Sequence, residues 1–286
     1  VYYILGSGLA GIACAHALLE LGASVTMIDV GADLEPERLK TVERLAGQDP
    51  EQWDWSLVES IKGDFLSART GLAFKPVYGS DFPYAQRELG TIAQNGTKCI
   101  LSHAKGGLSN VWGAALLPSR AEDLKGWPIG LADLKASYEA VAKIMGIAGA
   151  HDELEALFPY YAQAQAPPGA SRQAQTLLET LRQNKSALNA AGIFFGRSRL
   201  AIRTAPDENG RACADVGLCL SGCPYSAIYN AKQTLAVMIR NPRFQYLAGL
   251  AAEKVEETGQ TVRIFCRSLD GTSRMFEGSR AFIACG

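Results

Sequence analysis

The first 31 residues place a glycine-rich turn between a strand and a helix. Val1–Leu5 is a short run of β-forming residues, and the turn Gly6-Ser7-Gly8-Leu9-Ala10-Gly11 follows it directly. Ile12–Leu21 has the alanine- and leucine-rich composition of a helix, and Ser24–Asp29 has the pattern of a second strand. A strand, a GxGxxG turn, a helix and a second strand within about 30 residues are typical of the unit that binds the ADP half of a dinucleotide.

Each glycine of the turn is expected to have its own physical role. Gly6 permits the tight turn out of the strand, Gly8 lets the backbone approach a diphosphate, and Gly11 lets the helix pack close to the sheet. The free N–H groups at the start of the helix, near Leu9 and Ala10, then face the phosphates with the positive end of the helix dipole. The alternative is a glycine-rich turn that binds no ligand.

An acidic residue ends the second predicted strand. The carboxylate of Asp29 can accept hydrogen bonds from ribose hydroxyls, and it would repel a 2′-phosphate. With Val30 directly after it, Asp29 completes the predicted dinucleotide site of the first unit.

After Gly31 the chain departs from the regular strand–helix alternation of a plain NAD domain. A long excursion leads to two adjacent glycines, Gly106 and Gly107, which indicate backbone in close contact with a ligand. Ser109 and Asn110 follow as polar anchors. Further on, the pattern predicts helices at Leu131–Met145 and Ser171–Ala191, an extended segment at Ile193–Arg203, and strands at Phe244–Leu247, Val262–Arg267, Ser273–Phe276 and Arg280–Cys285.

Charge and hydropathy exclude several classes of function. The formal net charge is -1, which does not favour nucleic acid as a partner. No apolar run approaches the roughly 20 residues that span a bilayer, so no membrane span is predicted. No secretory signal is visible, and a cytoplasmic location is expected. Because the chain starts inside a strand at Val1 and ends after another at Gly286, we expect it to be a fragment.

Four segments, in this order, resemble the glucose–methanol–choline (GMC) family of FAD-dependent oxidoreductases. The third and fourth segments are similar to the bacterial sugar and sugar-acid dehydrogenase branch of that family. The segments are Gly6–Asp29; Gly106–Trp112; Gly126-Trp127-Pro128-Ile129 with Asp133, Leu134 and Tyr138; and Cys219–Pro224 with Asn230-Ala231-Lys232.

The resemblance implies an α/β fold. It consists of a Rossmann-like FAD-binding domain with a β-meander and helical insertions, and part of a second, substrate domain. The catalytic part of the family is expected beyond Gly286. The implied ranges are 1–33 for the first FAD-binding βαβ unit, 34–130 for an insertion with the flavin-contacting Gly-Gly segment, 131–205 for a partial substrate or cap region, and 206–286 for the Cys-rich loop and the return to the FAD-binding domain.

FAD is the cofactor that the resemblance implies. Some relatives attach it covalently through a His just before the Trp of the Gly-Gly segment; Val111 stands at that position, which predicts a noncovalent flavin. Val255 matches where the backbone meets adenine, and Ala284 and Gly286 match the strand end that returns to the cofactor. The full predicted set is Gly6, Gly8, Leu9, Ala10, Gly11, Asp29, Val30, Gly106, Gly107, Ser109, Asn110, Trp112, Val255, Ala284 and Gly286.

Three cysteines lie close together in the sequence. Cys213, Cys219 and Cys223 fall within one short segment, and Pro224 follows the last of them. Thiolates spaced in this way can converge on an iron–sulfur centre, and some relatives carry a three-iron (3Fe-4S) cluster on similarly spaced cysteines. A structural loop with unligated thiols is an alternative, as are a zinc site and a disulfide.

The function implied by the resemblance is oxidation of an alcohol, such as a sugar hydroxyl, by hydride transfer to the flavin. A cluster near FAD would pass electrons to an external acceptor and favours a dehydrogenase over an oxidase. The catalytic base cannot be named, because none of His16, His103 and His151 matches the family's catalytic motif. The alternatives are a catalytically incomplete flavin-binding module and an NAD-dependent dehydrogenase.

Overall fold

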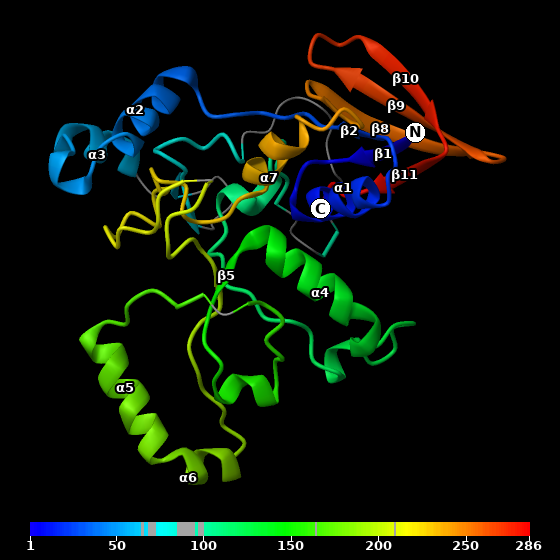
Figure 1. Ribbon diagram of the computed structural model, residues 1–286. Coiled ribbons are helices and arrows are strands. Elements are labelled where there is room, and N and C mark those ends of the chain that lie inside the picture. The colour runs from blue at the N-terminus through cyan, green and yellow to red at the C-terminus, as the bar shows by residue number, and fades with distance from the viewer. Residues whose placement is uncertain (64–65, 68–72, 85–94, 97–99, 164, 209) are drawn as a thin grey trace. The chain divides into compact units, whose positions relative to one another are not determined.

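The computed structural model describes residues 1–63, 66–67, 73–84, 95–96, 100–163, 165–208 and 210–286. The chain divides into two compact units (Figure 1). Unit 1 comprises Val1–Trp112, Gly217–Pro224 and Asn230–Gly286, and unit 2 comprises Gly113–Val216 and Tyr225–Tyr229. Parts of the predicted 34–130 insertion lie outside the described residues.

A parallel sheet forms the centre of unit 1. Its strands are β1 (Tyr2–Leu5), β2 (Val25–Ile28), β7 (Phe244–Leu247) and β11 (Arg280–Ile283), in the order β11-β1-β2-β7. All three neighbouring pairs run parallel. β2 is buried at every position, and its residues are apolar except for Thr26, as expected of a strand that is covered on both faces.

Helices cover one face of this sheet. α1 (Leu9–Glu20) connects β1 to β2, and α7 (Ala231–Met238) leads into β7. Ile4 of β1 packs with Ile12 of α1 and Leu235 of α7 in one buried cluster. The apolar side of each helix therefore packs against this face of the sheet.

An antiparallel sheet covers the opposite face. β8 (Leu250–Thr258), β9 (Thr261–Ser268) and β10 (Ser273–Gly278) form a meander in the order β10-β9-β8. Leu5 of β1 and Ile264 of β9 belong to one buried cluster between the two sheets. Because side chains alternate along a strand, Ile4 and Leu5 point to opposite faces and join the two layers to one strand. The α/β fold with a β-meander is confirmed.

The remaining elements of unit 1 lie between β2 and α7 in the sequence. Trp53 is buried, and its indole Nε1 donates to the carbonyl of Leu45 at 2.8 Å, so it anchors this region by packing. These elements are α2 (Pro36–Ala46), η1 (Pro50–Gln52), α3 (Trp55–Lys62), β3 (Leu66–Ser67), β4 (Ala73–Phe74) and the 3₁₀ turn η2 (Gly107–Asn110).

Unit 2 contains mostly helices and irregular chain. Helix α4 (Leu131–Met145) has the predicted bounds. The prediction of one helix over Ser171–Ala191 was wrong, because the first helix ends at Asn184. There the side-chain amide donates a hydrogen bond to the carbonyl of Thr180 at 2.9 Å. The other elements are η3 (Glu122–Leu124), β5 (Ile147–Ala148), η4 (Glu153–Ala156), α5 (Arg172–Gln183), α6 (Lys185–Ala190) and β6 (Leu200–Ala201).

Only Leu200–Ala201 forms a strand within the segment 193–203, which the sequence predicted to be extended. This strand pairs antiparallel with Ile147–Ala148. Unit 2 includes the range 131–205, whose assignment to a substrate or cap region stays a prediction.

No helix in the described part of the chain has the length and apolar character needed to cross a membrane.

The core of unit 1 is expected to respond very differently to the same change on adjacent strands. Ile4 of β1 is fully buried, whereas Ile283 of the neighbouring β11 is 73% exposed. Ile4→Ala should lower the free energy of unfolding by about 2–5 kcal/mol, because it leaves a cavity in a packed core. Ile283→Ala should change it by less than about 0.5 kcal/mol. Urea unfolding followed by circular dichroism measures both, and equal effects would contradict the assigned strand faces.

Candidate dinucleotide-binding site

Two glycines of the turn are required by the fold itself. Gly6 has a φ of +99°, and a Cβ there would lie 2.7 Å from the carbonyl oxygen of Ala284. A Cβ at Gly11 would overlap the carbonyl oxygen of Gly6. The turn thus closes tightly against the end of β11, and both residues must be glycine for steric reasons.

Gly8 has the opposite surroundings. No described atom lies within 4 Å of the place where its Cβ would stand, and its φ of −66° is ordinary for any residue. Gly8 is the N-cap of α1, and within the described chain no side chain caps this helix and no acidic residue lies in its first turn. Open space beside exposed helix N–H groups, which start at Leu9 and Ala10, suits a diphosphate.

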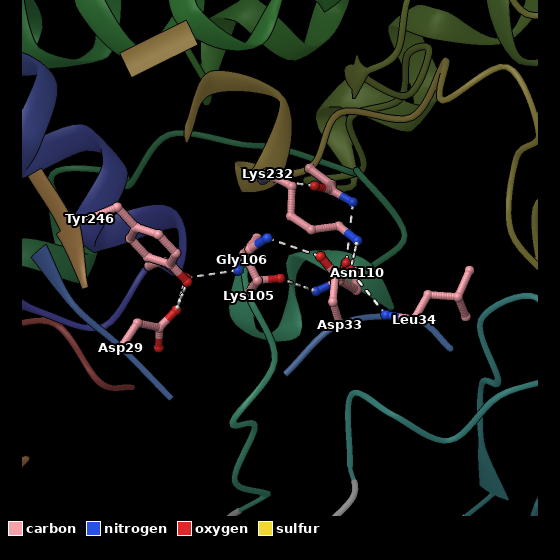
Figure 2. A network of polar contacts seen from close by, with 10 residues as sticks. Asp29, Asp33, Leu34, Lys105, Gly106, Asn110, Lys232 and Tyr246 are labelled. Carbon is pink, nitrogen blue, oxygen red and sulfur yellow. Dashed lines mark hydrogen bonds and ion pairs between the residues drawn. The ribbon is translucent and has the colours of Figure 1, made fainter. Parts of the chain in front are cut away.

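A buried carboxylate lies behind the turn (Figure 2). Asp29 is 9% exposed, and its Oδ2 accepts hydrogen bonds from the hydroxyls of Ser7 and of Tyr246, the latter at 2.9 Å. The Ser7 hydroxyl oxygen in turn accepts from the N–H of Gly106 at 2.8 Å. One short chain of hydrogen bonds therefore joins β2, β7, the glycine-rich turn and the Gly-Gly segment.

Burial and hydrogen bonds act in opposite directions on the pKa of Asp29. Burial raises the pKa of Asp29, and the hydrogen bonds from Ser7 and Tyr246 oppose that rise. The pKa of Tyr246 is also raised, by burial first and by the negative charge of Asp29 second. Tyr246 is thus a phenol that donates, and Asp29 is its acceptor.

The Gly-Gly segment lies directly against the first turn. Gly106 has a left-handed φ of 82° and precedes the 3₁₀ turn η2. A Cβ at Gly107 would lie 3.4 Å from the Cα of Gly8. The structure therefore brings together two glycine segments that the sequence separates by almost a hundred residues, as the prediction of a shared site requires.

Ser109 and Asn110 are both engaged with the protein backbone. The buried Ser109 hydroxyl donates to the carbonyl of Gly106 at 2.5 Å and accepts from the N–H of Ala231 at 2.9 Å. The Asn110 amide donates to the carbonyls of Lys105, at 2.9 Å, and Gly107, at 2.7 Å. These contacts fix the conformation of the Gly-Gly segment and join it to the start of α7. Contact of either side chain with a flavin ring stays a prediction.

A second ionic group flanks the same segment. Asp33 pairs with Lys105 at 3.0 Å and with Lys232 at 2.8 Å, one ammonium on each carboxylate oxygen. Burial alone would raise the pKa of Asp33, but the charge of Lys232 and hydrogen bonds from both lysines hold it below its usual value. Figure 2 shows this group beside Gly106 and Asn110.

The other predicted cofactor residues belong to several different elements of unit 1. Ala284 follows β11 and donates its N–H to the carbonyl of Leu5 at 2.9 Å, at the base of the turn. Val30 is buried directly after Asp29. Val255 pairs with Ile264 across β8 and β9 and packs on the core between the sheets. Trp112 lies just after η2, and Gly286 ends the chain.

The clustered cysteines gain no support as a metal site. Cys213 belongs to unit 2, whereas Cys219 and Cys223 belong to unit 1. Among the described residues, no three His, Cys, Asp or Glu side chains are placed to hold a metal ion. The loop around Cys223 packs on Tyr78, whose hydroxyl donates to the Cys223 carbonyl at 2.7 Å. The iron–sulfur prediction is therefore not carried further.

Sequence reasoning missed several residues of the site. Ser7 stands between two recognised glycines. Tyr246 and Lys232 lie in the range 206–286, which was assigned to the return to the FAD-binding domain, but neither residue was named in the predicted site. The position of Tyr246 near the carboxyl end of a parallel strand was a usable signal, because ligands bind at that edge of such sheets. The contact of Lys232 with Asp33 has no local signal.

No family model and no curated protein matches the sequence. Among solved structures, a pyridoxine 4-oxidase from Mesorbium loti matches with a TM-score of 0.51 and 15% identity, over 100% of this chain and 49% of that one. Formate oxidase from Aspergillus oryzae RIB40 matches with a TM-score of 0.44 and 14% identity, over 99% of this chain and 44% of that one. A flavoprotein/dehydrogenase from Cytophaga hutchinsonii matches with a TM-score of 0.33 and 10% identity, over 100% and 39%.

The first of these similarities extends along the whole chain. At 15% identity it shows a shared fold, and this chain spans about half the length of the solved structures it matches. The resemblance to the glucose–methanol–choline oxidoreductases seen in the sequence is thus confirmed at the level of the fold, which the chain shares with pyridoxine 4-oxidase.

Proposed function

We propose that this chain is the FAD-binding part of an oxidoreductase that oxidises an alcohol. The observation that carries the proposal is the open space at Gly8, beside the uncapped start of α1, with the Gly-Gly segment laid against it. A side chain at Gly8 would occupy that space, and nothing in the packing of the turn requires it to be empty. The diphosphate of a bound dinucleotide would fill this space.

The residues present fit this cofactor. The N–H groups at the start of α1, from Leu9 and Ala10 onward, would hold the diphosphate. Gly107 lets the backbone of the Gly-Gly segment approach closely, while Ser109 and Asn110 keep that segment in shape. FAD, when bound noncovalently, supplies the acceptor for a hydride from the substrate carbon.

Asp29 stabilises the site through hydrogen bonds to the segments that build it. Its carboxylate receives hydrogen bonds from two hydroxyls, and it keeps the glycine-rich turn, β2 and β7 in register. A contact between Asp29 and the ribose hydroxyls stays a prediction.

The proposal names the substrate and the electron acceptor only by chemical class. A small alcohol, with sugars among the candidates, is the proposed substrate, and no residue of this chain is assigned as the base that takes its proton. The preference for a dehydrogenase depended on an iron–sulfur cluster. Without support for the cluster, oxygen and an external acceptor both fit the proposal.

A flavin spectrum tests the cofactor. The purified 286-residue chain, mixed with FAD and then desalted, should keep paired absorbance bands in the near ultraviolet and the blue. A parallel sample mixed with NAD should release its ligand. A colourless protein that retains NAD would overturn the proposal. A yellow protein that does not oxidise alcohols with an artificial acceptor would identify a flavin-binding module.

Substitutions at Gly8 separate ligand binding from folding. Gly8→Asp should keep the free energy of unfolding or raise it by up to about 1 kcal/mol, because Asp is a favourable N-cap next to the helix dipole. The same substitution should weaken FAD binding by about a hundredfold or more, close to 2.7 kcal/mol, since its carboxylate occupies the phosphate position.

The matched control is Gly8→Asn, which caps the helix equally well without the charge. We expect a smaller loss of FAD affinity for this variant. Gly11→Ala should instead destabilise the fold itself, because its Cβ overlaps the backbone of Gly6. Titration by flavin fluorescence and thermal unfolding measure the two properties, and unchanged FAD binding in Gly8→Asp would contradict the proposed site.

A further inference from the structure

Three charged residues from distant parts of unit 1 form one ionic group, here named the Lys–Asp–Lys cluster. Asp33 follows β2, Lys105 precedes the Gly-Gly segment, and Lys232 lies in the first turn of α7. Each lysine binds a different oxygen of the Asp33 carboxylate, at 3.0 Å and 2.8 Å (Figure 2). Two ammonium groups against one carboxylate leave the cluster with a surplus of one positive charge.

The cluster flanks the glycine-rich turn across the Gly-Gly segment. Lys105 is bonded directly to Gly106, whose N–H donates to Ser7 of the turn. From the side of α7, Lys232 approaches so closely that a Cβ at Gly106 would lie 2.9 Å from its Cγ. Gly107 meanwhile lies against Gly8. The Gly-Gly segment therefore contacts Lys232 through Gly106 and the glycine-rich turn through Gly107.

The two lysines of the cluster are half-buried, whereas the side chain of Asp33 between them is 43% exposed. The side chains of Lys105 and Lys232 are 30% and 28% exposed. The Lys105 ammonium lies 6.0 Å from the ring centre of Tyr246, and the Lys232 ammonium lies 5.4 Å from that of Phe82. Because screening is weaker for partly buried charges, the field of the two lysines extends over about 10 Å.

We propose that the Lys–Asp–Lys cluster tunes the affinity of this site for a diphosphate, with Asp33 limiting how much positive charge Lys105 and Lys232 present to it. This inference rests on the proposed dinucleotide function. The competing explanation is a purely structural one, in which the ion pairs only hold the Gly-Gly segment against α7. The two explanations predict opposite results for one of the substitutions.

The test compares ADP with adenosine by isothermal titration calorimetry on the whole 286-residue chain. Asp33→Asn raises the charge of the cluster, so the dissociation constant of ADP should fall about threefold to fivefold. Lys232→Met removes one positive charge, so the same constant should rise by a similar factor. Lys232→Arg keeps the charge, so the dissociation constant of ADP should equal that of the wild type. Adenosine has no phosphate, and its affinity should stay constant throughout.

An exposed ion pair elsewhere in unit 1 provides matched controls. Glu37 and Lys40 of α2 pair at 2.9 Å with side chains that are 84% and 69% exposed. Glu37→Gln and Lys40→Met repeat the two charge changes in water, where screening is strong. Neither should change ADP binding. A change as large as that of the cluster variants would show that only net charge matters and would overturn the inference.

The outcomes distinguish this inference from the proposed function. If Asp33→Asn and Lys232→Met both weaken ADP and adenosine alike, the cluster is structural and the inference is wrong while the site stands. If the wild-type chain binds neither ADP nor FAD, the proposed function fails, and the inference fails with it. Opposite shifts for ADP, with adenosine unchanged, support both.

Discussion

Asp29 is a carboxylate held almost out of contact with water, and the segments that build the site meet at it. Ser7 reaches it from the glycine-rich turn and Tyr246 from β7, while Gly106 joins through the Ser7 hydroxyl. Burying an unpaired carboxylate costs several kcal/mol, and hydrogen bonds from fixed donors offset that cost. Any slip of the strands or of either glycine segment would leave these donors and acceptors unmatched. The buried acid thus makes the register of the parallel sheet and the shape of the site depend on each other.

The layers on both faces of the sheet leave Asp29 at the carboxyl ends of the parallel strands. Ile4 and Leu5, adjacent in β1, pack into different clusters, so β1 is covered by helices on one side and by the meander on the other. The carboxyl ends of the parallel strands remain as the edge where turns and loops collect. The glycine-rich turn follows β1 and Asp29 follows β2 at this edge. Binding at this edge is a property of open parallel sheets in general.

The sequence predicted the parts of the fold that depend on local pattern. The turn, the strands of the central sheet and helix α4 follow from glycine spacing and apolar periodicity over a few residues. Helix α7 was missed although Ala231, Leu235 and Met238 have helical spacing and are all buried. Such a short run between loops gives a weak signal. The cysteine spacing, by contrast, predicted a metal site for which the described residues give no support.

Contacts between distant segments lay beyond the reach of pattern reasoning. Asp33 and Lys232 are 199 positions apart, and Asp29 and Tyr246 are 217 apart. Nothing local to either partner specifies the other. The place of Tyr246 near the end of a strand marks it as a site candidate but does not identify Asp29 as its partner, and a lysine after an N-cap suits many structures. These pairs become visible only when the sheet order brings β7 beside β2.

The glycine-rich turn shows how one sequence motif divides between folding and binding. Gly6 and Gly11 are dictated by backbone contacts inside the protein, with Ala284 and with each other. Gly8 satisfies no such contact, since its φ suits any residue and the space beside it is open. A chain that needed only a stable turn would gain from a capping side chain at this N-terminal position, because Ser, Asp and Asn stabilise helix starts more than Gly does. Gly8 gives up that stabilisation and leaves room at the helix start, as the proposed diphosphate site requires.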